Sequence, residues 1–179
     1  MGNNWKITDT LTKVFADEVP DGQGSIRLSM LHRETVSCVI AYFGTADWGR
    51  YWKVSVKAPE GIETRLRRVE LVPSAYPCHK EQDDNYLRIV PGMYPDLLRD
   101  LDTEGDGADK KYLTKEVPGQ WRSLWLDVTV DAELAGGDYA IMIETETEDG
   151  EKETLKADLH VVDASLPPQK LLHTEWFHS

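Results

Sequence analysis

The sequence predicts an all-β fold, an antiparallel two-sheet β-sandwich of immunoglobulin-like or jelly-roll-like type, with a long irregular loop between two blocks of strands. Three features of the sequence support this prediction. Apolar and polar residues alternate in seven separate runs, the runs have the length of strands, and no long stretch has the spacing of an amphipathic helix. With 179 residues and 40% hydrophobic content, the chain is long enough for one domain with a sizeable core.

The expected strands form one block in the N-terminal half of the chain and a second block in the C-terminal half. The alternation is clearest in Trp121–Val130, where leucines and valines point to one face and Trp121 and Trp125 point to the other. Asp149–Gly150, between the last two runs, is typical of a hairpin turn. The seven expected strands are Ser25–Leu31, Thr35–Phe43, Tyr51–Lys57, Ile62–Val72, Trp121–Val130, Asp138–Thr147 and Glu153–Val162.

The segments outside these strands have weaker patterns. Asp9–Phe15 and the single turn Tyr94–Leu98 are the two stretches with helical spacing. The region 73–118 holds five of the nine prolines and is predicted to be irregular. Within it, Tyr76–Leu101 contains aromatic residues and is expected to pack against another surface, whereas the polar segment Asp102–Lys111 is predicted to be mobile.

Charge and cysteine content limit the classes of partner and compartment. The chain has 20 basic and 32 acidic side chains, and its net charge of −12 argues against nucleic acid and anionic membranes as partners. No segment approaches the ~20 consecutive apolar residues of a membrane helix, and no signal peptide is seen. The only cysteines are Cys38, expected as a free buried thiol, and Cys78, and two cysteines make no disulfide framework. These features favour a cytoplasmic location.

The polar motifs do not combine into a catalytic or metal site. Asp17–Glu18 and Asp83–Asp84 are adjacent carboxylates, but neighbouring turn positions give no reason for the split pKa values that acid–base catalysis needs. Asp102–Gly107 imitates the start of a calcium loop, yet the bidentate glutamate at the twelfth position is missing. His173 and His178, five residues apart in an expected strand, face opposite sides. We therefore predict no catalytic residue, no metal and no cofactor in this chain.

Aromatic residues are the remaining candidates for a binding surface, because sugars stack their apolar C–H faces on Trp and Tyr rings. Trp48, Tyr51 and Trp52 cluster around a glycine turn, and Trp121 and Trp125 share one strand face. A second domain packed on that face would bury the same rings without any ligand, and this interpretation is favoured. The candidates for carbohydrate binding or for a domain interface are Trp48, Trp52, Tyr86, Tyr94, Trp121, Trp125 and Trp176.

Four blocks of sequence, in this order, carry a resemblance to a known family: Leu71–Leu98, Gly119–Val130, Ala135–Glu144 and Leu166–His178. Together they resemble the N-terminal part of bacterial proteins that carry the domain of unknown function 4091, which are similar to glycoside hydrolase family 123. The resemblance implies a β-sandwich followed by a (β/α)8 barrel. It also implies that hydrolysis of N-acetylgalactosaminides depends on an adjacent Asp–Glu pair in that barrel and on the substrate's own acetamido group.

The resemblance and the strand pattern together predict two segments. Residues 1–165 are expected to form an accessory sandwich, and residues 166–179 a Pro-Pro linker followed by the first strand of a barrel that lies beyond the chain. This chain would then not be an enzyme but would buttress the catalytic barrel of a parent glycoside hydrolase. The alternative is an independent carbohydrate-binding module with exposed Trp and Tyr. The expected partners are the barrel domain, carbohydrate in the alternative, and a second copy through an unpaired C-terminal strand.

Overall fold

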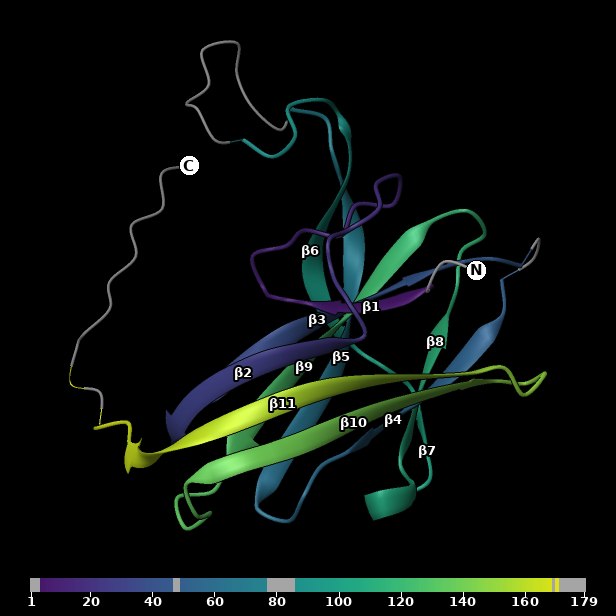
Figure 1. Cartoon of the computed structure of the whole chain (residues 1–179). Helices are drawn as coiled ribbons and strands as arrows, with labels where there is room; N and C mark the ends of the chain where they lie inside the picture. Colours follow the sequence, from purple (N-terminus) through teal and green to yellow (C-terminus); the bar gives the residue numbers. More distant parts are fainter. Residues whose placement is uncertain (1–3, 47–48, 77–85, 169, 171–179) are drawn as a thin grey trace.

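The structure, a computed structural model, describes residues 4–46, 49–76, 86–168 and 170. Within these ranges the chain forms eleven β-strands, one short 3-10 turn at Gly107–Asp109, and no α-helix. The strands make two sheets that pack face to face as a β-sandwich, as the sequence predicted (Figure 1). None of the described residues belongs to a helix long and apolar enough to span a membrane.

The first sheet has five strands in the order β1-β3-β9-β5-β6, and all its neighbouring strands are antiparallel. Its central strand, β9, places Leu126 opposite Cys38 of β3 and opposite Leu66 of β5. Because side chains alternate along each strand, these three residues point to the same face and pack into the core. The strands are β1 (Trp5–Thr8), β3 (Thr35–Phe43), β9 (Trp121–Val130), β5 (Ile62–Ser74) and β6 (Gly92–Asp100).

The second sheet has six strands in the order β2-β11-β10-β4-β8-β7. Its β2–β11 pair is parallel, so the prediction of an entirely antiparallel sandwich was wrong at this position. β2 and β11 are far apart in sequence, and no hairpin turn sets their relative direction. The strands are β2 (Ser25–His32), β11 (Lys152–Ser165), β10 (Gly137–Thr147), β4 (Tyr51–Lys57), β8 (Lys111–Lys115) and β7 (Thr103–Glu104).

All seven strands that the alternation predicted are present, and their ends lie within a few residues of the predicted ones. The predicted hairpin is confirmed, because β10 and β11 pair antiparallel over ten registered residue pairs. Gly150 in the connecting turn has a φ of 82°, a conformation that glycine adopts without steric cost.

The prediction of one long irregular loop over 73–118 was wrong, because β6, β7 and β8 lie within this region. Tyr94–Leu98 is part of β6 and not a helical turn. Pro95, which argues against a strand, lies on an edge strand beside the register shift between Glu70 and Leu71, where a missing backbone donor is tolerated. The segment predicted to be mobile contains Thr103–Glu104, which pairs with β8.

The stretch Asp9–Phe15, which has helical spacing, forms turns and a loop instead of a helix. Asp9 Oδ1 accepts hydrogen bonds from the backbone N–H of Leu11 at 2.9 Å and of Thr12 at 3.0 Å. A side chain that bonds the backbone two and three residues ahead stabilises a turn. The loop then crosses the outer face of the first sheet, where Trp121 N–H donates to Ala16 O at 2.9 Å.

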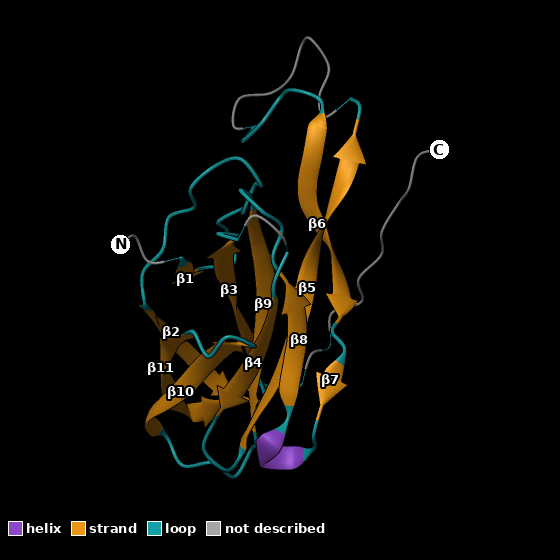
Figure 2. Cartoon of the chain, turned by 90° about the vertical axis from the view of Figure 1, so that its right-hand side faces the viewer, coloured by secondary structure: helices purple, strands orange, loops and turns teal. Residues whose placement is uncertain are grey.

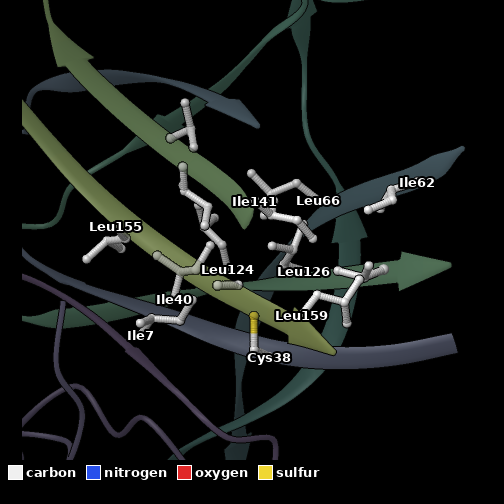
Figure 3. Packing of buried hydrophobic residues seen from close by; sticks show 14 of the residues in the cluster. Ile7, Cys38, Ile40, Ile62, Leu66, Leu124, Leu126, Ile141, Leu155 and Leu159 are labelled. Carbon is white, nitrogen blue, oxygen red and sulfur yellow. The ribbon is translucent and has the colours of Figure 1, made fainter. Parts of the chain in front are cut away.

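The main hydrophobic core lies between the two sheets and draws residues from both (Figure 3). Cys38 is buried there as a free thiol, as predicted, and burial raises its pKa to about 12, with a smaller contribution from the charge of Asp127. Burial also raises the pKa of the Tyr42 phenol to about 12, against the hydrogen bond with Thr114, whose oxygen lies 2.7 Å away. Neither group is therefore ionised near neutral pH.

A second, smaller hydrophobic cluster lies on the outer face of the first sheet. It consists of Val14, Val39, Ala41 and Trp121, with Trp125 packed against it. Val14 comes from the loop after β1, and its side chain is only 2% exposed. This loop therefore covers part of the sheet face that, in the sequence-based prediction, a second domain would cover.

Several predictions concern residues outside the described ranges. They include Trp48, Trp176, Cys78, Asp83–Asp84 and nearly all of the segment 166–179. In that last segment, Leu166 N–H donates to His32 O at 2.9 Å, directly after the end of β11. The strand expected at the C-terminus, and self-association through it, stay predictions.

Candidate functional site

The hairpin formed by β5 and β6 projects beyond the rest of the sandwich (Figure 2). Its outer end carries the apolar hairpin surface, a group of large apolar side chains that are exposed to solvent. Apolar groups of this size on a folded domain commonly mark an interaction site. The surface consists of Tyr76, Tyr86, Leu87, Ile89, Val90, Met93 and Leu97, with exposed fractions from 46% for Met93 to 90% for Tyr76.

An aromatic pocket of about 550 Å³ lies where the hairpin meets the loop that follows β1. Phe15, Tyr86 and Tyr94 contribute rings to its lining. Tyr94 O–H donates to Val90 O at 2.6 Å, and its ring meets Phe15 edge-on with 5.7 Å between ring centroids. The pocket thus has an ordered aromatic wall, and Tyr86 is half exposed beside it.

Arg88 connects this pocket to the loop after β1. Its guanidinium lies over the Phe15 ring at 3.9 Å from the centroid, and it forms ion pairs with Asp17, at 2.8 Å, and with Glu18. The hydrogen bond from Arg88 holds the pKa of Asp17 below its usual range. The adjacent carboxylates Asp17 and Glu18 therefore share one cation, and these ion pairs attach the loop to the hairpin.

The predicted aromatic candidates lie in separate environments. Trp52 is 2% exposed and belongs to the main core, and Trp121 is 7% exposed and belongs to the smaller cluster. The interpretation that these two rings are exposed for sugar stacking was wrong, because Trp52 faces the first sheet and packs against Trp5 in the core, and the loop after β1 covers Trp121. Trp125 is half-buried, and Tyr86 and Tyr94 meet at the aromatic pocket. Trp48 and Trp176 lie outside the described residues.

Trp125 takes part in a polar cluster on the outer face of the first sheet. Its Nε1–H donates to Asp127 Oδ1 at 2.7 Å, and Ser37 Oγ donates to the same oxygen at 2.7 Å. Arg67 pairs with the other oxygen of Asp127. The indole N–H, hydroxyl and guanidinium all satisfy one carboxylate, so the cluster holds the Trp125 ring in place.

A buried carboxylate, Glu116, lies behind Trp52 and was not singled out by sequence reasoning. Its side chain is fully inaccessible to solvent, and it accepts hydrogen bonds from Arg50 Nε at 3.1 Å, Trp52 Nε1 at 3.2 Å and Ala46 N at 3.2 Å. Ala46 and Arg50 both belong to the connection between β3 and β4. The carboxylate of Glu116 therefore attaches this connection to the core. Its three partners lie 64 to 70 positions away from Glu116 in the sequence, so no local sequence pattern indicates these contacts.

No group of three or more His, Cys, Asp or Glu side chains within the described ranges could hold a metal ion. His160 Nδ1 lies 2.8 Å from Asp138 Oδ1, and His32 Nδ1 lies 3.1 Å from Ala132 O. Glu104, in the segment that imitates a calcium loop, pairs with Lys53 at 2.7 Å. The buried Nε2 of His32 has no hydrogen-bond partner among the described residues.

The outer face of the second sheet has a different character, because charged side chains of opposite sign alternate across its strands. Exposed pairs of this kind contribute little to stability and keep a surface soluble. Tyr51 on β4 and Val162 on β11 are exposed apolar side chains of this sheet, but they lie on separate strands with β10 between them. The pairs are Lys53 with Glu104 at 2.7 Å, Lys57 with Glu144 at 2.6 Å, Lys152 with Glu146 at 3.0 Å and Lys156 with Asp158 at 2.6 Å.

No protein-family model matches the sequence, and no curated protein matches it either. Among solved structures, the fold is similar to that of a family 123 glycoside hydrolase from Clostridium perfringens, with a TM-score of 0.60 and 9% identity over 91% of this chain. The chain spans 28% of that enzyme's length. The N-terminal domain of PorA matches 90% of this chain, with a TM-score of 0.45 and 7% identity. At 9% identity, the similarity to the glycoside hydrolase shows a shared fold with one part of that enzyme and no more.

Proposed function

We propose that this chain is the non-catalytic β-sandwich domain of a glycoside hydrolase of the group that carries the domain of unknown function 4091, and that it supports the catalytic domain. Two findings support the proposal. The sandwich matches a part, about a quarter, of a family 123 glycoside hydrolase in fold. In addition, the carboxylates of Asp17, Glu18, Glu116 and Asp127 are each engaged in an ion pair with an arginine.

The apolar hairpin surface is the observation that carries this proposal. It is concentrated on one projecting element, whereas the opposite sheet face is covered by charged pairs. Domain interfaces within one chain are expected to be partly apolar and to bury large side chains. The apolar hairpin surface thus has the composition of a docking site, whereas the charged outer face of the second sheet has that of a surface in contact with solvent.

Replacing Leu87 and Leu97 together with serine is expected to leave the isolated chain as stable as the wild type, because both side chains are already about half exposed or more. In the parent protein that includes the catalytic domain, the same change is expected to lower the thermal midpoint and the yield of soluble protein. Differential scanning calorimetry of both forms measures the effect. Tyr51→Ser with Val162→Ser is the matched control, because these exposed side chains lie on strands of the second sheet, away from the hairpin. Equal effects of the two double variants on the parent would contradict the supporting role.

The aromatic pocket favours a second candidate function, binding of a carbohydrate by the isolated chain. Its volume of about 550 Å³ lies within the range of ligand pockets, roughly 300–1,000 Å³, and two tyrosines line it. The half-exposed ring of Tyr86 could stack on a sugar face without any rearrangement of the core. Of the aromatic residues that the sequence offered as candidates for carbohydrate binding, Tyr86 and Tyr94 are the two that line this pocket.

If this second function holds, the isolated chain binds glycans that contain N-acetylhexosamine, and Tyr86→Ala weakens the binding by about tenfold through loss of ring stacking. Isothermal titration calorimetry measures the affinity. Tyr51→Ala is the matched control, because Tyr51 and Tyr86 are equally exposed, at 49%, and Tyr51 lies on β4 away from the pocket. Absence of glycan binding by the wild type would leave the supporting role as the function of the domain.

A further inference from the structure

A second cavity, separate from the aromatic pocket, opens at one end of the sandwich. On the inner face of β9, the leucines and valines at positions 124–130 lie in the main core, and the next residue on that face is Arg122. On β5, Arg68 follows Leu66 in the same way. The inner face of the first sheet therefore continues past the apolar core as a polar surface. It forms the floor of the Arg122 cleft, a cavity of about 510 Å³ lined by Tyr42, Arg68, Glu70, Met93, Glu116 and Arg122 among others.

The carboxylates in this cleft already have cationic partners. Glu70 Oε1 accepts from Arg68 Nε at 2.8 Å, and Arg99 lies 3.8 Å from it. Glu116 is paired with Arg50 at 3.1 Å. Neither carboxylate is therefore available to neutralise Arg122.

Arg122 itself lacks an anionic partner within the part of the chain that the structure describes. Its Nη2 donates to the neutral side-chain oxygen Gln120 Oε1 at 2.9 Å, and its buried Nε has no hydrogen-bond partner. The other half-buried arginines differ from it, because each is paired with a carboxylate. They are Arg50 with Glu116, Arg67 with Asp127, Arg68 with Glu70 and Arg88 with Asp17.

A half-buried guanidinium without a counter-charge is unfavourable, because burial removes part of its hydration and no anion compensates its charge. The planar guanidinium matches a carboxylate in shape and charge. The cleft lining contains three cationic side chains and two carboxylates, which leaves one net positive charge in a protein whose net charge is −12. One positive charge suits a ligand with a single carboxylate.

We propose that the Arg122 cleft is a binding site for a small organic carboxylate, and that an acidic sugar residue is the ligand class that fits it. The cleft volume is that of a small-molecule site, and its lining offers polar groups for hydroxyls as well as the apolar side chain of Met93. Arg122 is the residue that recognises the carboxylate. This proposal does not depend on the supporting role or on the aromatic pocket.

The test is an NMR titration of the chain with D-glucuronate, with D-glucose as the neutral probe of matched size. The wild type is expected to show saturable shifts around Val69, Leu71 and Val117 with glucuronate, weakened by added salt, and no such shifts with glucose. Arg122→Met keeps most of the aliphatic stem, removes the charge, and is expected to weaken binding at least tenfold. Arg122→Lys keeps the charge without the planar fork and is expected to bind with an affinity between these two.

Arg27→Met is the matched control, because Arg27 is an exposed arginine on β2 that does not line the cleft. It is expected to bind glucuronate as the wild type does. If Arg122→Met does not fold, the comparison of Arg122→Lys with Arg27→Met still decides the role of the guanidinium. The proposal is overturned if wild-type protein does not bind glucuronate, if glucose binds equally well, or if loss of the Arg122 guanidinium leaves the affinity unchanged.

Discussion

Replacing Glu116 with alanine is expected to lower the free energy of unfolding by about 3–5 kcal/mol, the range measured when one partner of a buried ion pair is removed. The side chain of Glu116 is inaccessible to solvent and accepts from Arg50, Trp52 and Ala46. Without it, the indole N–H of Trp52 stays buried without an acceptor, and Arg50 keeps Glu151, at 2.7 Å, and the hydroxyl of Thr45, at 2.9 Å. The large effect arises because the donors cannot be rehydrated in place.

Urea denaturation followed by tryptophan fluorescence measures this change for the isolated chain. Glu104→Ala is the matched control, since Glu104 also pairs with a cation but is half exposed, and little change in the urea midpoint is expected. Glu116→Gln separates charge from shape: it retains one acceptor oxygen and should fall between alanine and the wild type. If Glu116→Ala lowers the free energy of unfolding no more than Glu104→Ala does, the buried contacts of Glu116 make no net contribution to stability.

Replacing Trp52 with alanine is expected to cost about 3–5 kcal/mol, which is typical of a large buried aromatic residue. Trp52 is 2% exposed and packs edge-on against Trp5, with 5.1 Å between ring centroids. Trp5 in turn stacks on Tyr42 at 4.8 Å. Removal of the ring therefore leaves a cavity beside two other aromatic residues and removes a donor to Glu116.

The same urea experiment tests this prediction, and two variants sharpen it. Trp52→Phe keeps most of the apolar volume but loses the indole N–H, and about 1–2 kcal/mol of destabilisation is expected from the unpaired acceptor. Tyr51→Ala, at the adjacent and half-exposed position, should stay within about 1 kcal/mol of the wild type. Because Trp52 and Glu116 are in contact, the double variant should be less destabilised than the two single losses added together. Simple additivity would contradict the coupling.

These two positions affect how ligand experiments are interpreted. Substitution of Trp52 is expected to destabilise the whole domain, so a weaker binding of a ligand by such a variant would not identify Trp52 as a sugar-stacking residue. Tyr86 and Arg122 are better probes, because one is half exposed and the other lines a cleft outside the apolar core. Thermal stability measured beside each titration separates loss of fold from loss of a contact.

The strands could be predicted where both sheets impose a regular pattern. In β9, alternate positions face either the main core or the smaller cluster, and the sequence shows this as leucine and valine alternating with tryptophan and polar residues. The missed strands are short or lie at or near sheet edges. β1 has four residues and β7 has two, and β6 contains a proline. Their pairing depends on partners distant in the chain, so no local pattern specifies them.

The candidate site could be predicted only in part, because residue type does not determine burial. Trp52, Trp121 and Trp125 have similar sequence surroundings, yet one lies in the main core, one under a loop and one in a half-exposed polar cluster. Tyr86 and Tyr94 were correctly grouped in one region, but the pocket that joins them also needs Phe15 from the N-terminal loop. Arg122 and Glu116 were missed, because their significance depends on the partners around them.

Side-chain alternation along the chain was enough to establish an all-β sandwich, its main strands and the hairpin of β10 and β11. The reason is that burial of every second residue is a local property of each strand. The packing of the two sheets decided everything that depends on distant residues. In the folded chain β11 pairs parallel to β2, Trp52 is buried against Glu116, and Arg122 has no carboxylate partner among the described residues. Whether a charge is compensated and whether a side chain is buried both depend on all the residues around it, and these residues come together only when the chain folds.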